Sequence, residues 1–484
     1  MHQDSAVHDE PDPSDGAALA EAIRSGRTTA GATMEAALAR AAEVEAFGAI
    51  SFLAADLGRS DAAAIDAGLK RRPKYYAMKP FAGVPFLMKD LGAAAIGLPV
   101  VCGSASLPPV PPETDAELAR RFKAGGLVPF GITTVPEFGL SLSSEPAIGP
   151  VARNPLDPTL TAGGSSGGAA AAVAAGIVAL AHATDAGGST RVPAACCGLV
   201  GLKPTRGAMP GGPDFGNHIG GIAAELVVSR SLRDTALALE HFSGSGEGYV
   251  PDPDLDLPIA SRLDEGVAPL RVGLVLDVAE LRPIDADRRA ATEHAAAVLA
   301  SAGHSVTMLD PHRFTPLLQA SEMVFDRIIC TNLARNRPDL SKVERLTAAV
   351  ARRGLEMTAR DYQAAEIAAV RTAHALWRLF DEIDILVTPM LSGPPLAIGA
   401  FPFDHDDVEL QWRRMSDFAP YAMLANVAGT PALTIPHGRD GAGLPLPVQL
   451  IGPMGSDGLL LRLARSLQKA VPWSFRTTIA GLPS

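Results

Sequence analysis

The sequence is poor in aromatic residues and in charged residues of either sign. Phe, Trp and Tyr make up 5% of the 484 residues and Asp, Glu, Lys and Arg together 20%, whereas 47% of the residues are hydrophobic. A core with so few aromatic rings has to be built from Ala, Leu, Val and Ile, with backbones that approach closely. The composition therefore predicts a soluble globular protein with a large core.

Basic residues are too few for a surface that binds nucleic acid. Lys and Arg number 42 against 53 Asp and Glu, which gives a net charge of −11. Phosphate backbones and anionic membranes attract the opposite sign. The longest apolar run, 169–181, is mostly Ala and falls short of the roughly 20 residues that span a bilayer, so it is interpreted as a buried helix. Neither nucleic acid nor a membrane is expected as a partner.

The four cysteines suit neither a metal centre nor a disulfide framework. Cys196 and Cys197 are adjacent, and Cys102 and Cys330 lie far from them in the sequence. These spacings match no zinc site, and an adjacent pair is badly placed for an ordinary structural disulfide. Residues 1–14 lack the basic and apolar regions of a signal peptide and are expected to be disordered. We therefore expect a cytoplasmic protein without a metal.

Short apolar runs alternate with amphipathic stretches along the chain, as in α/β domains. Two helices are expected between residues 16 and 44, as a packing layer that takes no part in the active site. No linker divides the chain into the three domains that its length alone would suggest. Strands are expected at 84–88, 127–132, 270–276, 305–309 and 385–388 and in short runs within 421–470, and helices at 115–124, 232–242, 285–302, 361–383 and 459–469.

Glycine is concentrated in one segment. Residues 163–221 hold 15 of the 47 glycines, which indicates backbone conformations or close approaches that a Cβ would block. The Gly-Gly-Ser-Ser-Gly-Gly run at 163–168 lacks the Lys of a phosphate loop. It formally matches a nucleophile elbow centred on Ser166, but residues 154–162 contain two Pro and several turn formers instead of the strand which that motif requires.

Together with other motifs, this run resembles the amidase signature family. It is followed by a small-residue stretch, by Asp-Ala-Gly-Gly-Ser-Thr-Arg at 185–191 and by Cys-Gly-Leu-Val-Gly-Leu-Lys-Pro-Thr at 197–205. Further matching segments lie at 83–90, 136–138, 426–432 and 446–450.

The resemblance implies an α/β fold with a mixed β-sheet and helices on both of its faces. A single large domain would span 15–484, with the core motifs at 81–221 and 421–470. The region of about 244–381, which varies in the family, would form the substrate pocket. Cys330 lies in this region and either packs in the core or lines the pocket, whereas Cys197 is expected to be a small core residue.

The resemblance also implies a Ser-Ser-Lys triad, with Ser189 as nucleophile, Ser165 as bridging serine and Lys89 as general base. A serine hydroxyl is a weak nucleophile until a base takes its proton, and a lysine can be that base only when it is neutral. Lys89 follows an apolar run, as a partly buried base should, but the adjacent Asp90 would favour its charged form unless that carboxylate points elsewhere. The Gly164–Ser165 peptide bond is expected to be cis.

The residues around the expected nucleophile have supporting roles. Backbone N–H groups of Ala186, Gly187, Gly188 and Ser189 would form the oxyanion hole that binds a tetrahedral intermediate. A scaffold of four other residues would hold the site without touching the substrate: Gly164, Ser166, Asp185 and Arg191.

The implied activity is hydrolysis of carbon–nitrogen acyl bonds through an acyl-enzyme, without metal or cofactor. The glycine-rich motifs look most like those of bacterial amidases such as aryl acylamidases, urethane-cleaving amidases and nylon-oligomer (6-aminohexanoate cyclic dimer) hydrolases. Expected substrates are therefore small-molecule amides and anilides, with carbamates (urethanes) and esters as further candidates. The enzyme would act as a monomer or a homodimer.

Two other functions stay open. One is the amidase component of a tRNA-dependent glutamine or asparagine amidotransferase, which releases ammonia from glutamine inside a complex. Members of that group commonly carry Gln in the stretch where this chain has Val192 directly after Arg191. The other is a catalytically silent binding protein, against which the presence of all three triad positions argues.

Overall fold

The computed structural model describes residues 14–211, 219–244, 252–279 and 283–483. The disorder expected for residues 1–14 falls on residues outside these ranges, apart from Ser14, which is half-buried.

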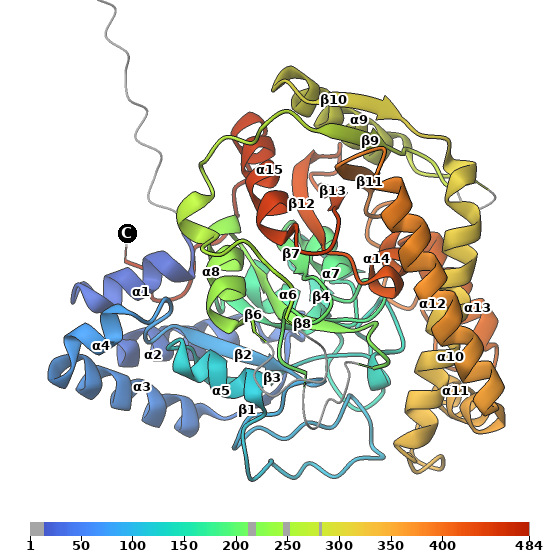
Figure 1. The fold of residues 1–484 in the computed structure, drawn as a ribbon. Coiled ribbons are helices and arrows are strands. Elements are labelled where there is room, and N and C mark those ends of the chain that lie inside the picture. Colours follow the sequence, from blue (N-terminus) through green and yellow to red (C-terminus); the bar gives the residue numbers. More distant parts are fainter. Residues whose placement is uncertain (1–13, 212–218, 245–251, 280–282, 484) are drawn as a thin grey trace, which may run out of the picture.

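An eleven-stranded mixed sheet lies at the centre of the molecule (Figure 1). Its spatial order is β1-β3-β2-β6-β8-β7-β12-β13-β11-β9-β10. Strands β3, β2 and β6 run parallel to one another, as do β11, β9 and β10, while β8, β7, β12 and β13 join these two blocks by antiparallel pairing. The bounds are β1 Ile50–Leu53, β2 Pro85–Lys89, β3 Val128–Thr133, β6 Leu180–Asp185, β7 Val200–Lys203, β8 Ala224–Ser229, β9 Arg271–Leu274, β10 Ser305–Met308, β11 Ile385–Pro389, β12 Ala432–Arg439 and β13 Pro445–Ile451.

Helices flank this sheet, so the expected fold class, one large α/β domain around a mixed sheet, is confirmed (Figure 1). Their bounds are α1 Gly16–Arg24, α2 Ala30–Glu43, α3 Ala55–Arg71, α4 Pro73–Ala77, α5 Glu117–Ala124, α6 Gly167–Ala174, α7 Arg191–Cys197, α8 Leu232–Phe242, α9 Ala286–Ser301, α10 Thr315–Arg335, α11 Arg345–Glu356, α12 Ala359–Leu379, α13 Val408–Phe418, α14 Ala422–Ala428 and α15 Asp457–Ala470.

The Ala-rich helix at the centre is shorter than the sequence suggests. A buried helix over 169–181 is wrong in its extent, because α6 ends at Ala174 and Gly176 turns the chain with a φ of +79°. Residues from Leu180 onward belong to strand β6. A short apolar run is equally compatible with a buried helix and with a buried strand, so periodicity does not place this boundary.

Two further expectations are corrected. A strand does precede the Gly-Gly-Ser-Ser-Gly-Gly run, because β4 (Arg153–Asn154) and β5 (Asp157–Thr161) form a separate two-stranded ribbon. An edge ribbon of this kind tolerates the two prolines that argued against a strand. In the C-terminal segment, residues 422–428 form α14 instead of a strand.

Much of the variable region is helical. Helices α10, α11 and α12 pack on one another at the side of the sheet that carries β11, drawn yellow to orange in Figure 1. Cys330 lies on α10 and is fully buried in the main core, which favours core packing over a place in the pocket wall. Cys197 is buried as expected.

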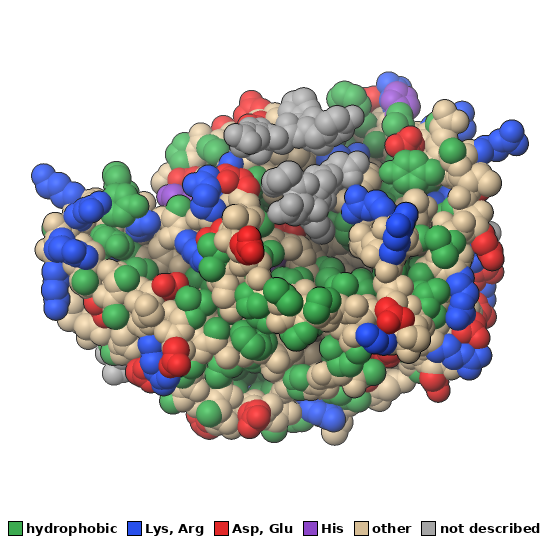
Figure 2. Space-filling model, turned by 90° about the horizontal axis from the view of Figure 1, so that it is seen from below, with side chains coloured by type: hydrophobic (Ala, Val, Ile, Leu, Met, Phe, Trp, Pro, Cys, Tyr) green, Lys and Arg blue, Asp and Glu red, His purple; other side chains and the backbone are tan. Residues whose placement is uncertain are grey.

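The surface mixes charges of both signs. Figure 2 shows one face on which hydrophobic side chains gather toward the centre, while many Lys, Arg, Asp and Glu side chains lie toward the periphery. Within the described ranges, no helix combines the length and the apolar character needed to cross a membrane.

Candidate active site

Lys89 stands at the carboxyl end of strand β2 and is fully buried. Its Nζ lies 2.8 Å from Ser165 Oγ and 2.7 Å from Thr184 Oγ1, and the Thr184 carbonyl oxygen is 3.3 Å away. Thr184 is near the carboxyl end of β6, the strand beside β2 in the sheet. The ends of two parallel strands thus bring the amine to the bridging serine that the sequence predicts.

Burial controls the protonation of Lys89. It lowers the pKa of the Lys89 amine from its ordinary value of 10.5 to about 7, although the carboxylates of Asp185 and Glu225 act in the opposite direction. A lysine with such a pKa is neutral in a large fraction of molecules near neutral pH. The amine can therefore accept a proton without a metal or another base to activate it.

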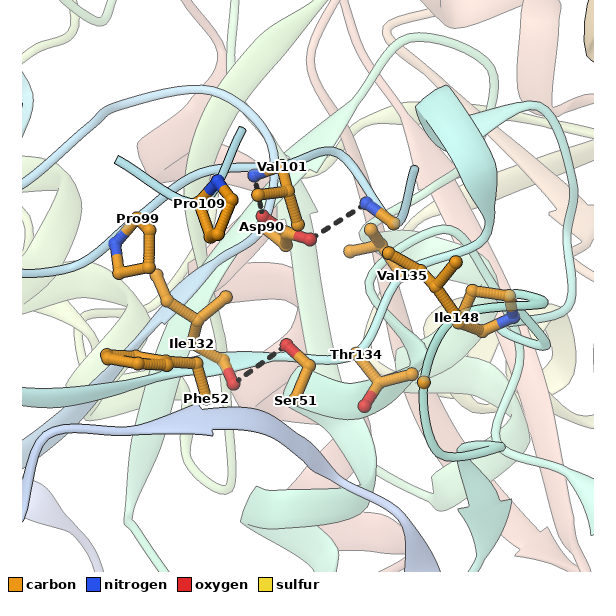
Figure 3. A pocket seen from close by; sticks show the side chains of 13 residues that line it. Ser51, Phe52, Asp90, Pro99, Val101, Pro109, Ile132, Thr134, Val135 and Ile148 are labelled. Atoms are coloured by element: carbon orange, nitrogen blue, oxygen red, sulfur yellow. Dashed lines mark hydrogen bonds between the residues drawn. The ribbon is translucent and has the colours of Figure 1, made fainter. Parts of the chain in front are cut away.

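Asp90 points away from the amine. Its carboxylate accepts hydrogen bonds from the backbone N–H groups of Val101 (2.6 Å) and Gly103 (2.8 Å), as the dashed lines in Figure 3 show. Burial raises the pKa of Asp90 to about 6 in spite of these bonds. This carboxyl group belongs to the wall of a separate, largely apolar cavity of about 130 Å³ (Figure 3). Neither Ser165 nor Ser189 lines that cavity.

Ser165 sits on a tightly packed loop. The Gly164–Ser165 peptide bond is cis, as the resemblance implied. A Cβ on Gly164 would come within 2.6 Å of the backbone N of Ser143, so only glycine fits there. The Ser144 hydroxyl lies 3.2 Å from the Ser165 carbonyl oxygen and accepts a hydrogen bond from the N–H of Gly167 at 3.0 Å. Close backbone packing explains the glycines on both sides of the serine pair.

Ser189 lies in the turn between β6 and α7 and is 6% exposed. Its carbonyl oxygen accepts a hydrogen bond from the N–H of Ser166 at 3.2 Å, which ties the two serine-bearing loops together. Among the described residues, no hydrogen bond joins Ser189 Oγ to Ser165 Oγ. Hydrogen bonds of this kind often tighten only when substrate binds.

Asp185 and Arg191 form a buried ion pair that closes the turn. Arg191 Nε and Nη2 each donate to the Asp185 carboxylate at 2.9 Å. Burial alone would raise the pKa of Asp185, but the Arg191 guanidinium and hydrogen bonds from Arg191, Asn426 and the N–H of Gly188 hold it well below its ordinary range. Paired charges that share several hydrogen bonds persist in a core where a lone charge would not. Asp185 and Arg191 thus form hydrogen bonds with each other and with the turn, as a scaffold role would require.

The expected oxyanion donors divide into two sets. The N–H of Gly188 donates to Asp185 Oδ1 at 2.7 Å and therefore helps to hold the turn. The N–H groups of Ala186, Gly187 and Ser189 have no hydrogen-bond partner within the described ranges. The N–H of Gly188 is therefore engaged inside the turn, whereas those of Ala186, Gly187 and Ser189 remain without a partner among the described residues.

Ser166 is fully buried behind the site and is not placed as a nucleophile. Its hydroxyl donates to the Thr184 carbonyl oxygen at 3.3 Å and lies 3.4 Å from the N–H of that residue. Its own N–H is bound to Ser189. These contacts agree with a scaffold and not with a nucleophile elbow in the Gly-rich run.

Several residues around the site were not predicted from the sequence as parts of it. Thr184 contacts the amine, while Asn426 and Gln449, which lie in matching segments, bind Arg191 Nη2 at 2.7 Å and Nη1 at 2.8 Å. His182 and Glu225 lie behind Lys89. The position of Thr184 directly before the Asp185 motif is a signal that could have identified it, whereas Glu225 reaches the site only through strand pairing.

The variable region reaches the expected oxyanion turn through α10. A Cβ on Gly187 would come within 2.8 Å of the Phe325 ring, and Phe325 packs edge to face on Trp412 with ring centroids 5.2 Å apart. One wall beside the turn is thus built by a segment in which the family's motifs are absent. Within the described ranges, no group of three His, Cys, Asp or Glu side chains is arranged to hold a metal ion.

Comparisons with known proteins agree with this arrangement. The model of the family described as Amidase matches residues 32–461. The chain is 34% identical over 476 residues to "Putative amidase AmiC" of Mycobacterium tuberculosis, with 95% of each chain covered. It is 32% identical over 431 residues to the 6-aminohexanoate-cyclic-dimer hydrolase of Paenarthrobacter ureafaciens, with 84% of this chain and 86% of the relative covered.

Solved structures give the same result. A 6-aminohexanoate cyclic dimer hydrolase superposes with a TM-score of 0.87 at 30% identity, covering 97% of this chain and 98% of the other. A glutamyl-tRNA(Gln) amidotransferase component from Thermotoga maritima gives 0.67 at 26% identity over 84% and 87% of the two chains, so it is a more distant neighbour. With the family model spanning most of its length, this chain belongs to the amidase signature family and is a hydrolase of non-peptide carbon–nitrogen amide bonds.

Proposed function

We propose that Ser189 is the nucleophile, that Ser165 relays its proton, and that Lys89 is the general base of this hydrolase. The observation that carries the proposal is the buried Lys89 amine, whose Nζ lies 2.8 Å from Ser165 Oγ. The loop that bears Ser165 is in turn bound to Ser189 by a backbone hydrogen bond. Among the described residues, no His, the usual base for a serine nucleophile, is hydrogen-bonded to Ser165 or Ser189.

The reaction proceeds in two halves. Ser189 Oγ attacks the acyl carbon while its proton passes to Ser165 Oγ, and the proton of Ser165 passes to neutral Lys89. The tetrahedral intermediate collapses, the carbon–nitrogen bond breaks, and the amine leaves with a proton returned along the same path. Water then attacks the Ser189 ester, and the same groups take and return its proton. The enzyme ends each cycle in its starting protonation state.

The negative charge on the intermediate is bound by backbone N–H groups. Ala186, Gly187 and Ser189 offer three donors within one turn, while Gly188 and Asp185 keep the turn in shape. Removal of one such donor typically costs about 2.7–4 kcal/mol of transition-state stabilisation. Arg191 and Ser166 act at one remove, by holding Asp185 and the neighbouring loop.

The substrates we propose are small synthetic amides. The support is the likeness to proteins named 6-aminohexanoate-cyclic-dimer hydrolase and, at 25% identity and a TM-score of 0.83, aryl acylamidase. Carbamates and esters pass through tetrahedral intermediates that use the same donors, so they are proposed as further substrates. The pocket would be shaped by the region of about 244–381, through α10 and its Phe325. We propose action in a bacterial cytoplasm, as a monomer or homodimer.

Hydrolysis of a panel of anilides, carbamates, esters, cyclic and linear amides and glutamine tests this proposal. Anilides or amides should be hydrolysed best, and Ser189→Ala should abolish turnover. Ser305→Ala, on the exposed part of β10, is the matched control and should behave as wild type. Near-normal turnover by Ser189→Ala would refute the nucleophile, and a strict preference for glutamine would replace the proposed substrate class by that of a tRNA-dependent amidotransferase.

A further inference from the structure

Two buried side chains behind Lys89 take no part in the relay. His182 on β6 is fully buried and Glu225 on β8 is 2% exposed. His182 Nδ1 accepts a hydrogen bond from the backbone N–H of Lys89 at 3.3 Å, and Nε2 lies 3.1 Å from Glu225 Oε2. Because Nδ1 is an acceptor, the ring proton sits on Nε2 and is donated to the carboxylate. The ring is therefore neutral and joins the backbone of Lys89 to Glu225.

Glu225 also holds the chain just beyond Lys89. Its Oε2 accepts a second hydrogen bond from the N–H of Ala93 at 3.3 Å. Between Lys89 and Ala93, Gly92 adopts a φ of +97°, and a Cβ on Gly92 would come within 2.5 Å of Glu225 Oε1. The pair thus fixes the segment that carries the amine at two points, one at Lys89 and one four residues later.

The second oxygen of this carboxylate is left without a partner. Glu225 Oε1 is buried and makes no hydrogen bond within the described residues. An unpaired buried oxygen of a carboxylate is costly unless its charge meets another charge. The strand register pairs Glu225 with Thr184, whose hydroxyl contacts the Lys89 amine. The Glu225 carboxylate thus acts on the Lys89 amine from beyond that threonine and raises the pKa of the amine.

The other ionisable groups that face Lys89 have partners of their own or are neutral, although the Asp185 carboxylate also raises the pKa of the amine. Asp185, on β6, is paired with the Arg191 guanidinium. Asp90, directly after β2, is turned to backbone N–H groups. Burial raises the pKa of the Cys102 thiol, on the following loop, well above its ordinary value, so that group is neutral.

We propose that His182 and Glu225 are positioning residues for the general base: His182 fixes the backbone of Lys89, and the Glu225 carboxylate provides the uncompensated negative charge that stabilises the ammonium formed in the relay. This inference rests on the proposed role of Lys89 as base. In a site this dry, the amine would otherwise hold a proton too weakly to accept it from a serine at neutral pH.

The test is the pH dependence of the rate at which a fluorophosphonate labels the full-length protein at Ser189. The label needs no substrate, and its rate follows the neutral fraction of the base. Glu225→Gln keeps the size and the hydrogen-bonding capacity of the side chain but removes its charge. The acid limb of the profile should move to lower pH by about one unit, the shift that a nearby opposite charge produces, while the rate at high pH is largely kept.

His182 is tested by the height of the profile. His182→Leu should lower the labelling rate at every pH, and His182→Gln, whose amide can accept from Lys89 and donate to Glu225, should restore much of it. Asp234→Asn is the matched control for Glu225→Gln. Asp234 is a buried carboxylate that accepts hydrogen bonds from the N–H groups of Gly16 and Ala17 and, among the described residues, has no hydrogen bond to Lys89, Ser165 or Ser189. The Asp234→Asn variant should have the acid limb of its profile at the same pH as the wild type.

The outcomes separate this inference from the proposed function. A folded Glu225→Gln variant whose acid limb stays in place or moves to higher pH overturns the role of Glu225. If that variant does not fold, Glu225→Asp, which withdraws the charge by one methylene, should give a smaller shift in the same direction, and no shift overturns the inference. Labelling of Lys89→Met at the wild-type rate would instead refute the proposed base itself.

Discussion

The surroundings of two buried lysines differ in a way that separates the base we propose from a structural amine. Lys89 and Lys203 both end strands of the same sheet, and burial lowers the pKa of each to about 7. Lys89 Nζ meets the hydroxyls of Ser165 and Thr184. Lys203 Nζ donates to the carbonyl oxygen of Pro204 at 2.7 Å, which has no proton to give. A low pKa makes a lysine available as a base, but the neighbouring hydroxyl decides whether it can act as one.

The charged groups around the two lysines also differ. After burial, Arg191 and Arg206 lower the pKa of Lys203 further, while Asp185 and Asp457 oppose them. Asp457 in turn accepts hydrogen bonds from Thr205, which anchors the chain after β7 to the start of α15. The Lys203 cluster therefore holds elements together, whereas the Lys89 amine contacts the hydroxyl of Ser165, which we propose as the proton relay.

Replacing each lysine by methionine should separate the two roles most strongly. Lys89→Met should lower kcat by about 10³-fold or more, because Ser189 loses its base. Lys203→Met should keep kcat within about threefold in the folded protein, because no reacting group contacts that amine. Anilide hydrolysis at pH 8, with circular dichroism to verify folding, gives the comparison. Equal losses in both variants would remove the distinction.

Substitutions of two buried aspartates, Asp185 and Asp457, should destabilise the protein to different extents. Asp185→Asn leaves the buried Arg191 without its carboxylate, which should cost about 3–5 kcal/mol of the free energy of unfolding. Burial raises the pKa of Asp457 despite its bonds to Thr205, so Asp457→Asn should cost no more than about 1.5 kcal/mol. Urea denaturation of the two variants measures both values, and a larger loss at Asp457 would contradict the account.

The pH profile of kcat/KM should report Lys89 alone. Activity requires the neutral amine, so it should rise with pH through about 7 and level off by about pH 8.5, a tenfold change per unit on the acid side. Lys203→Met should leave this midpoint unchanged although its pKa is also about 7. A profile that keeps rising beyond pH 9 would indicate a lysine with its ordinary pKa and would exclude Lys89 as described.

The smallest effect is expected at the second hydroxyl beside the base. Thr184→Val keeps the shape of the side chain and removes the 2.7 Å contact to Lys89 Nζ, which should lower kcat by about tenfold, the equivalent of one hydrogen bond. Thr434→Val, which removes a buried hydroxyl bond to Val448 on another part of the sheet, is the control and should leave kcat unchanged. Wild-type activity of Thr184→Val would show that the Thr184 hydroxyl does not help to orient the amine.

Contiguous motifs were enough to single out Lys89 and Ser165, whose side chains lie in contact, because the backbone that shapes this part of the site is local. Gly164 and the turn at 185–189 carry their conformations in their own residue types. The same holds for α8, whose bounds at 232–242 follow from its amphipathic pattern and the Ser231 cap.

The parts that sequence patterns missed depend on distant pairing. Glu225 reaches Lys89 only because β8 pairs with β6 in a particular register, and no local pattern encodes that register. The N–H of Gly188 was expected in the oxyanion hole, but Asp185 takes it in a contact that spans the turn. Helices α11 and α13 carry no motif and were not predicted.

The most direct measurement is the mapping of a fluorophosphonate adduct by mass spectrometry at pH 8, in the wild type and in the two lysine variants. The account predicts a single adduct on Ser189 in the wild type and in Lys203→Met, and no adduct in Lys89→Met over the same time. An adduct on Ser165 or Ser166, or labelling of Lys89→Met at the wild-type rate, would contradict it.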